Sequence, residues 1–191
     1  MSEIVRLGTR LLIITFVAAL ALSITNMVTA GPIEVQIQNE NDMSRQAVLP
    51  EAETFELMDD MKDIDLADWP DIKEVYTGKS GDRVVGYTFK ISVKGYGGSI
   101  EMTLGIDTEG KISGLKIGNH QETPGLGAKA AESSFQDQYK GKNAEGELTV
   151  TKASNSGNNE VEAITGATIT TRAITDGVNN ACRLYLEIVE Q

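Results

Sequence analysis

The chain has 191 residues, 40% of them apolar, and a formal net charge of -11 at pH 7. This is enough apolar sequence for one sizeable packed domain plus an appendage, which argues against a disordered chain. When Glu3, Arg6 and Arg10 are left out, the rest of the chain contains 27 acidic and 15 basic residues. A surface so negative repels phosphate backbones, so no nucleic-acid partner is expected.

Cysteine and histidine usage limits the chemistry of the chain. Cys182 and His120 are the only residues of their types. The chain can therefore form neither an internal disulfide nor a Cys/His metal site. Any redox chemistry requires a borrowed cofactor, and no metal site is predicted.

Residues 11–33 contain no charged side chain. As a helix they would span roughly 34 Å at about 1.5 Å per residue, enough for the ~30 Å hydrocarbon core of a bilayer. We therefore predict a transmembrane helix. A cleaved signal peptide is the alternative, with residues 28–30 as its small-residue cleavage site. The charge-free run is long for a signal peptide and Pro32 follows the cut closely, which favours a retained helix.

The charges on either side of this helix predict its orientation. Arg6 and Arg10 precede it, whereas the first basic residue after it is Arg45. Positive charge marks the cytoplasmic side of a membrane helix. We therefore expect a single-pass protein of the cytoplasmic (inner) membrane with this organisation: a cytoplasmic N-terminus at 1–10, a transmembrane helix at 11–33, an irregular tether at 34–44 and an extracytoplasmic domain at 45–191.

The start of the extracytoplasmic domain shows a helical pattern. Apolar residues recur at mostly helical spacing between residues 45 and 61, with Pro50 near the first turn, which predicts a helix there. The acidic stretch 58–69 lacks the spacing and the central glycine of a calcium loop. We interpret it as a solvated face.

The middle of the chain has the pattern of a β-sheet. Four runs rich in β-branched and aromatic residues are divided by glycine-containing turns, at 72–76, 84–93, 99–106 and 111–117. Such runs predict an antiparallel meander. Shorter strands are expected at 147–151 and 161–164.

Two helices are predicted to accompany this sheet, so the fold class is α+β, an antiparallel sheet flanked by helices. One is expected over 128–139. The other follows Thr170 or Thr171, either of which is a reasonable N-cap. Its apolar face is predicted from the spacing of Ile174, Val178, Ala181, Tyr185 and Ile188. Cys182 lies beside that face, which predicts a buried and unreactive thiol.

Two loops carry more glycine than ordinary turns require. Residues 95–98 read Gly-Tyr-Gly-Gly, which fits either close approach of the backbone to a ligand or a flexible loop. Residues 118–127, rich in glycine and with one proline, precede a predicted helix. This loop offers backbone amides and the positive end of a helix dipole, and a purely structural turn is the alternative.

A hydroxyl-rich turn at 165–168, Thr-Gly-Ala-Thr, runs directly into the last predicted helix. Two hydroxyls, a glycine, a small alanine and a helix N-terminus together suit a phosphate group. The lysine and the remaining glycine of a Walker loop are absent, so nucleotide hydrolysis has no support. From these residues alone, a phosphate site and an unliganded capped turn both remain open.

Taken together, these motifs resemble those of covalent FMN-binding domains. Residues 165–168 are similar to the S/T-G-A-T motif of that family, residues 122–127 to its E-T-P-G-L-G signature, and residues 95–98 to its glycine-tyrosine loop. With one N-terminal membrane helix, the chain resembles the G subunits of Rnf-type electron-transport complexes. The C subunits of sodium-pumping NADH:quinone oxidoreductases share these motifs.

The resemblance implies a cofactor and a set of residues that hold it. FMN would be attached through its phosphate to the Thr168 hydroxyl by a separate flavin transferase. Thr168 would then be an attachment point, and the chain would contain no catalytic residue. Lys129 would place a cation near reduced flavin, or be an ordinary exposed lysine. The implied binding residues are Thr168, Thr165, Gly166, Ala167, Ile169, Thr170, Glu122, Thr123, Pro124, Gly125, Leu126, Gly127, Lys129 and Tyr96.

The resemblance also implies a role. The chain would be an electron-carrying subunit of a translocase, a membrane complex that couples ferredoxin:NAD oxidoreduction to sodium or proton movement. Its partners would be the other membrane and peripheral subunits, and the transferase during maturation. The alternatives are a C-type subunit of a sodium-pumping NADH:quinone oxidoreductase, a stand-alone membrane-tethered flavin-binding or sensing module, and a structural ectodomain without cofactor.

Overall fold

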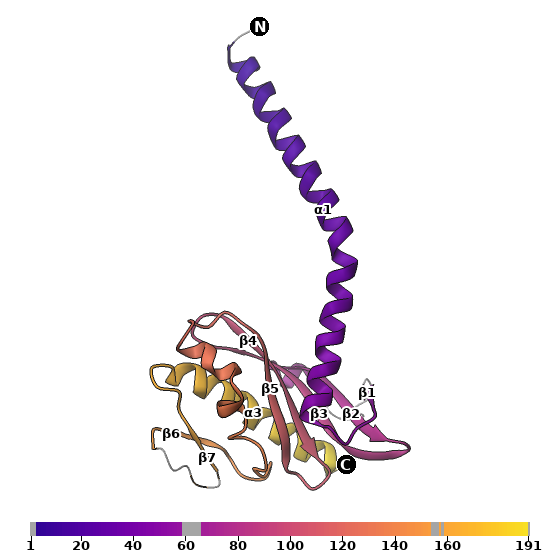
Figure 1. Cartoon of the computed structure of the whole chain (residues 1–191), viewed down its shortest axis with the longest axis vertical. Coiled ribbons are helices and arrows are strands. Elements are labelled where there is room, and N and C mark those ends of the chain that lie inside the picture. Colours follow the sequence, from indigo (N-terminus) through magenta and orange to yellow (C-terminus); the bar gives the residue numbers. More distant parts are fainter. Residues whose placement is uncertain (1–2, 59–65, 154–156, 158, 191) are drawn as a thin grey trace. The chain divides into compact units, whose positions relative to one another are not determined.

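Helix α1 runs without interruption from Glu3 to Val48 (Figure 1). The structure is a computed structural model that describes residues 3–58, 66–153, 157 and 159–190, and residues 1–42 and 43–191 form two compact units. Residues 11–33 are helical, as predicted, and the helix is long and apolar enough to cross a membrane. Four threonine hydroxyls in it donate to the carbonyl four residues earlier, at Thr9, Thr15, Thr25 and Thr29. Thr15, Thr25 and Thr29 lie within residues 11–33, and there these bonds would satisfy the hydroxyls where lipid offers no partner.

The irregular structure predicted for residues 34–44 is wrong, because α1 continues through them. Pro32 lies inside the helix and removes only one backbone donor there. The polar residues that follow include good helix formers, glutamate and glutamine among them. Gln36 also donates to Glu40 one turn later at 3.2 Å.

The helix predicted over 45–61 is also wrong beyond its first turn. Helix α1 ends at Val48, and β1 occupies Thr54–Leu57. Pro50 lacks the amide that a continuing helix needs, and β1 instead completes the edge of a sheet by pairing with β2. The last residues of the predicted helix, and residues 59–65 of the acidic stretch, lie outside the described part of the chain.

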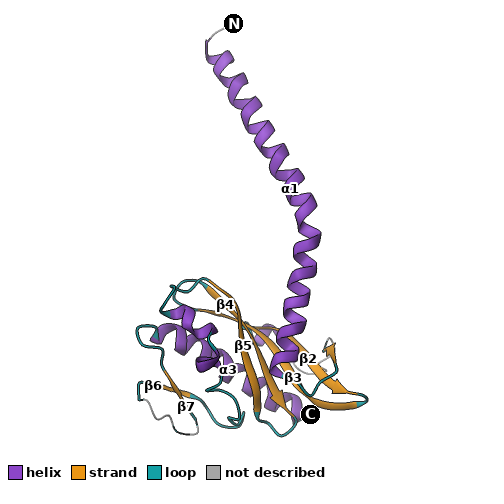
Figure 2. Cartoon of the chain, viewed as in Figure 1, coloured by secondary structure: helices purple, strands orange, loops and turns teal. Residues whose placement is uncertain are grey.

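The main sheet has five antiparallel strands in the order β1-β2-β3-β4-β5. Figure 2 shows the strands in orange. Its other members are β2 (Ile72–Ser80), β3 (Arg83–Lys94), β4 (Ser99–Asp107) and β5 (Ile112–His120). This confirms the predicted meander and the α+β class. Two short strands, β6 (Thr149–Thr151) and β7 (Glu160–Glu162), pair in parallel as a separate sheet.

The helix predicted over 128–139 is two short turns. These are the 3₁₀ helix η2 (Gly127–Ala131) and the α-helix α2 (Ser133–Gln136). The Gln136 side chain donates to the carbonyl of Ala131 at 2.7 Å, and the amide of Phe135 bonds to Glu132 instead. A side chain therefore takes the carbonyl that a continuous helix would have used. Another 3₁₀ turn, η1 (Leu66–Asp68), precedes β2.

Helix α3 (Thr168–Val189) packs against the core face of the sheet. Ile174, Val178, Ala181 and Tyr185 are buried as predicted, among core side chains of β3 and β4 that include Phe89 and Leu104. The predicted N-cap is wrong. Ala167 is the N-cap residue and makes no side-chain capping bond, and the hydroxyls of Thr170 and Thr171 bond to other partners.

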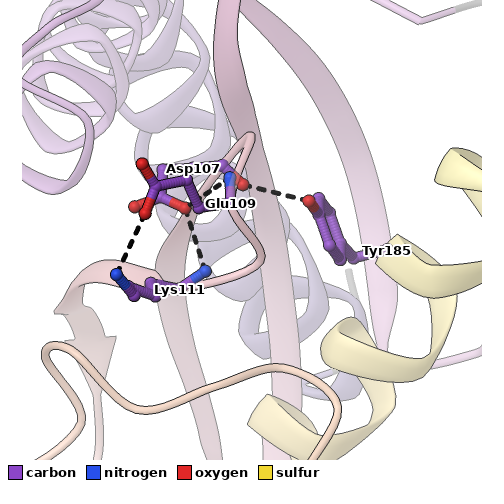
Figure 3. A network of polar contacts seen from close by, with 4 residues as sticks. All are labelled: Asp107, Glu109, Lys111 and Tyr185. Atoms are coloured by element: carbon purple, nitrogen blue, oxygen red, sulfur yellow. Dashed lines mark hydrogen bonds and ion pairs between the residues drawn. The ribbon is translucent and has the colours of Figure 1, made fainter.

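Tyr185 ties the later part of α3 to the turn between β4 and β5 (Figure 3). Its hydroxyl donates to the carbonyl of Asp107 at 3.1 Å. The Asp107 carboxylate accepts from the amides of Glu109 and Lys111, each at 2.9 Å. The turn is thus closed by its own carboxylate and fixed to the helix by a tyrosine.

Val48, Leu49 and Ala52 pack on the other face of the sheet, in a segment that follows the boundary between the two units. Neighbouring residues on a strand point to opposite faces, so Gly105 points away from the core face that holds Leu104. Ser113 donates to the carbonyl of Val48. A Cβ on Gly105 would lie 2.6 Å from the Ser113 hydroxyl oxygen and would collide with the Val48 carbonyl oxygen. Backbone therefore packs directly on backbone at this point.

We expect Cys182 to be inert to thiol reagents in the folded protein. It is 2% exposed, and burial raises the pKa of its thiol to about 12, so at pH 8 on the order of one thiol in ten thousand is ionised. Titration with a chromogenic disulfide reagent should show no fast thiol in the native chain and one in denaturant. Fast labelling of the native protein would contradict the buried position.

Candidate functional site

A cavity of about 430 Å³ lies where three loops of the 43–191 unit meet. One loop joins β3 to β4, the second joins β5 to η2, and the third leads into α3. Ten of the fourteen predicted residues line it: Tyr96, Glu122, Thr123, Leu126, Gly127, Gly166, Ala167, Thr168, Ile169 and Thr170. The structure therefore brings the three sequence motifs to one place.

The turn before α3 has a geometry that its sequence explains. Gly166 has a φ of +80°, in the left-handed region that glycine adopts without strain. The amide of Ala167 donates to the carbonyl of Ile164 at 2.9 Å, which closes the turn. The next residue, Thr168, begins the helix and lines the cavity.

The threonine hydroxyls around this turn are not equivalent. Thr171 accepts from the amide of Ile164 at 3.1 Å and donates to the carbonyl of Ala167 at 3.1 Å. Thr170 donates to a carboxylate oxygen of Glu122 at 2.6 Å. Among the residues that the structure describes, none forms a hydrogen bond with the half-buried side chain of Thr168. Thr168 and Thr170 both line the cavity, but the Thr170 hydroxyl is bonded to Glu122, so the Thr168 hydroxyl is the one available for chemistry.

The N-terminus of α3 presents backbone donors at the same wall. The first amides of any α-helix have no acceptor within the helix. In the described part of the chain, no side chain accepts from the first amides of α3, and the first turn holds no acidic residue. The positive end of a 22-residue helix thus lies beside Thr168, a setting that favours a phosphate or another anion.

Apolar side chains form part of the remaining cavity wall. Tyr96, Leu126 and Ile169 all line it, and their exposed fractions are 71%, 43% and 59%. Large apolar groups with this much exposure suit the faces of a planar, partly apolar ligand. The site thus combines an anion-binding end with an apolar section.

Glu122 is the buried acidic residue of the cavity wall, with 6% of its surface exposed. One carboxylate oxygen, Oε1, accepts from the amide of Gly97 at 2.8 Å, and the other accepts from Thr170. The role of Gly97 was missed in the sequence analysis. The glycine-rich loop at 95–98 was the available signal. It was interpreted either as close approach of the backbone to a ligand or as a flexible loop, and neither interpretation includes contact with another loop of the same chain.

Four predicted residues are not part of the cavity lining among the residues described. Thr165 and Lys129 are exposed and line a neighbouring hollow of about 210 Å³. Pro124 and Gly125 are exposed at the tip of their loop. Within the described residues no group of three or more His, Cys, Asp or Glu side chains is placed to hold a metal ion.

The fold and cavity define the class of protein. Residues 95–183 match the FMN-binding domain family. The fold is similar to that of the C subunit of the Na(+)-translocating NADH-quinone reductase from Parabacteroides distasonis, with a TM-score of 0.61 and 21% identity, over 82% of this chain and 96% of that chain. NqrC from Shewanella oneidensis gives a TM-score of 0.53 at 18% identity, over 62% of this chain and 61% of that chain. These likenesses show a shared fold.

Curated relatives are more specific. The chain is 44% identical over 189 residues to the G subunit of the Na(+)-translocating ferredoxin:NAD(+) oxidoreductase complex of Acetobacterium woodii, covering 94% of this chain and 90% of that protein. The G subunit of the proton-translocating complex of Clostridium ljungdahlii is 33% identical, with coverage of 94% and 90%. The chain belongs to the family of G subunits of Rnf-type ion-translocating oxidoreductase complexes.

Proposed function

We propose that this chain carries FMN as a phosphoester on Thr168 and passes electrons within a membrane complex that couples ferredoxin:NAD oxidoreduction to sodium or proton translocation. The relatives named above are subunits of ferredoxin:NAD(+) oxidoreductase complexes, and the matched domain family binds FMN. The C-type alternative has weaker support, because its solved relatives are only 18% and 21% identical to this chain.

The observation that carries the attachment site is the state of the Thr168 hydroxyl. It lies at the cavity wall with no described hydrogen-bond partner, at the start of an uncapped helix. Attachment would form a bond between the Thr168 oxygen and the FMN phosphorus and break the pyrophosphate bond of FAD. AMP would leave, and the threonine proton would pass to the transferase or solvent.

The residues of the cavity suit FMN on physical grounds. Its volume, about 430 Å³, lies within the range of small-molecule and cofactor sites, about 300 to 1,000 Å³. The amides at the N-terminus of α3 would stabilise the charged phosphate by roughly 0.3 to 1 kcal/mol. Tyr96, Leu126 and Ile169 would contact the ring system, which supplies the redox chemistry while the protein sets its position and exposure.

The membrane helix supports a place within a complex. Residues 18, 19, 21 and 23 are Ala, Ala, Ala and Ser, small side chains that allow close helix packing in a membrane. We propose that α1 packs against membrane subunits, with residues 1–10 in the cytoplasm and the FMN domain on the other side of the inner membrane. Lys129 lines the neighbouring hollow, so it would influence the bound FMN only through its positive charge.

Intact mass and peptide mapping of the native protein test the attachment. We expect one adduct, equal to FMN less one water, on the peptide that contains Thr168. The same spectrum reports whether residues 1–30 are retained. A native protein with no flavin adduct would contradict covalent attachment.

Co-purification tests membership in a complex. A tagged full chain solubilised in mild detergent from its native membranes should recover stable membrane subunits. A tagged chain that carries the adduct and yet recovers none would favour the stand-alone flavin module. The comparison uses the same tagged chain with residues 11–33 replaced by an unrelated membrane helix, which leaves Val48 and its contacts with the sheet in place and should lose these partners.

A further inference from the structure

Glu122 joins two walls of the cavity that lie far apart in the sequence. Its Oε1 accepts from the amide of Gly97, on the loop between β3 and β4, at 2.8 Å. Its Oε2 accepts from the Thr170 hydroxyl, in the first turn of α3, at 2.6 Å. One buried carboxylate thus bridges two elements.

The surrounding backbone packs closely around this carboxylate. A Cβ on Gly95 would collide with Oε1 of Glu122. A Cβ on Gly127 would lie 2.9 Å from the Glu122 Cβ and 2.9 Å from the Thr170 hydroxyl oxygen, and would also collide with Oε2. Gly95 and Gly127 therefore both pack against the carboxylate. The contact at Gly95 gives a structural reason for the extra glycine in residues 95–98.

The residues next to the two hydrogen-bond donors line the cavity. Tyr96 directly precedes Gly97, and Ile169 directly precedes Thr170. Thr168, whose hydroxyl is available, is two residues before Thr170. A shift of either donor relative to Glu122 would therefore move a cavity wall relative to the attachment hydroxyl.

The energetics make the bridge cooperative. A buried carboxylate is costly unless hydrogen bonds compensate for its lost water, and hydrogen bonds to a charged acceptor are among the stronger ones in proteins. Loss of one donor leaves the buried carboxylate with less compensation for its lost water, so states in which it leaves this position become less costly and the remaining contact opens more often. The two walls should therefore loosen together.

We propose that Glu122 is a positioning residue that holds the 95–98 loop against the first turn of α3, so that the cavity has its binding shape before FMN arrives. The link to FMN rests on the proposed function, whereas the joining of the two walls does not. Glutamine at this position would keep the bridge, because its oxygen accepts from Gly97 and its amide nitrogen donates to the Thr170 hydroxyl.

The first experiment needs no flavin. Hydrogen exchange is measured on the flavin-free full chain in detergent, for peptides that contain residues 95–98. We expect Glu122→Ala and Thr170→Val to speed exchange there by about tenfold or more, because local opening governs exchange, and Glu122→Gln to stay near wild type. Thr170→Val is decisive, since residue 170 is not in the loop that is measured. Unchanged exchange in Thr170→Val and Glu122→Ala would overturn the proposal.

The second experiment measures flavin attachment with purified transferase, FAD and magnesium. Misplacement by about 1 Å can slow a positioned reaction on the order of a hundredfold. We expect attachment to slow by about tenfold or more in Glu122→Ala, and Glu122→Gln to restore it. Glu101→Ala is the matched control, because this glutamate is exposed on β4, and it should load like wild type.

The two experiments separate the two claims. If wild type takes no flavin while Thr170→Val still loosens residues 95–98, the proposed function fails and the positioning role stands. If wild type loads but Glu122→Ala loads equally fast with unchanged exchange, the positioning role fails and the proposed function stands. If Glu122→Ala does not fold, Thr170→Val alone decides the positioning role.

Discussion

Thr168→Ala is expected to abolish covalent flavin on this chain. When the wild-type chain is co-expressed with a flavin transferase and separated by denaturing electrophoresis, its band should fluoresce. The variant band should be dark at equal protein load, because alanine has no oxygen to accept the phosphate. Thr168 begins α3 and lines the cavity, so the loss should be complete.

Two further variants make this result specific to one oxygen. Thr168→Ser keeps a hydroxyl and should retain fluorescence. Thr108→Ala removes an exposed hydroxyl from the turn between β4 and β5 and should fluoresce like wild type. Full fluorescence of Thr168→Ala would instead move the attachment to another hydroxyl, and Thr165, exposed in the neighbouring hollow, would be tested next.

Gly105→Ala is expected to destabilise the 43–191 unit by about 1 to 3 kcal/mol, as overpacking in a close-packed region does. The added Cβ would lie 2.9 Å from the carbonyl carbon of Val48 and 2.6 Å from the Ser113 hydroxyl oxygen. The Val48 neighbours are backbone atoms, which cannot swing away from the methyl group as the end of a flexible side chain could. Residues 43–52 would have to shift on the sheet.

Two other glycines give a graded comparison. A Cβ on Gly114 would lie 3.1 Å from the Cα of Val48, and one on Gly118 would have its nearest neighbour at 3.5 Å, an ordinary contact. Urea unfolding of the detergent-solubilised full chain, followed by the fluorescence of the single tryptophan, Trp69, should rank Gly105→Ala below Gly114→Ala. Gly118→Ala should stay within about 0.5 kcal/mol of wild type. Equal stability of all three would rule out the close packing at Val48.

Local patterns predicted the sheet and the last helix because burial there follows a simple period. The apolar residues of β3 and β4 and the face of α3 that contains Ile174 and Val178 repeat at the spacing of their elements. β1 could not be recognised in this way. Its residues belong to a run with helical spacing, and only the pairing of Thr54–Leu57 with β2 makes it a strand.

The candidate site was predictable from its motifs but not in its internal contacts. The resemblance supplied ten residues that do line the cavity. It could not show that Thr165 and Lys129 face a neighbouring hollow, because residues close in sequence can point to different sides of a turn. Nor could it show that Glu122 is held by Gly97 and Thr170, because that contact depends on three loops that meet only in the folded chain.

The order of these three loops along the chain has a consequence for biosynthesis. The cavity needs residues 95–98, 122–127 and 165–170 together, so the earlier two loops have no third wall until α3 has been made and has docked on the sheet. A transferase that requires the assembled cavity would therefore load finished domains and pass over incomplete ones. The fraction of chains that fluoresce would then report, in a living cell, how much of this protein has reached its native state.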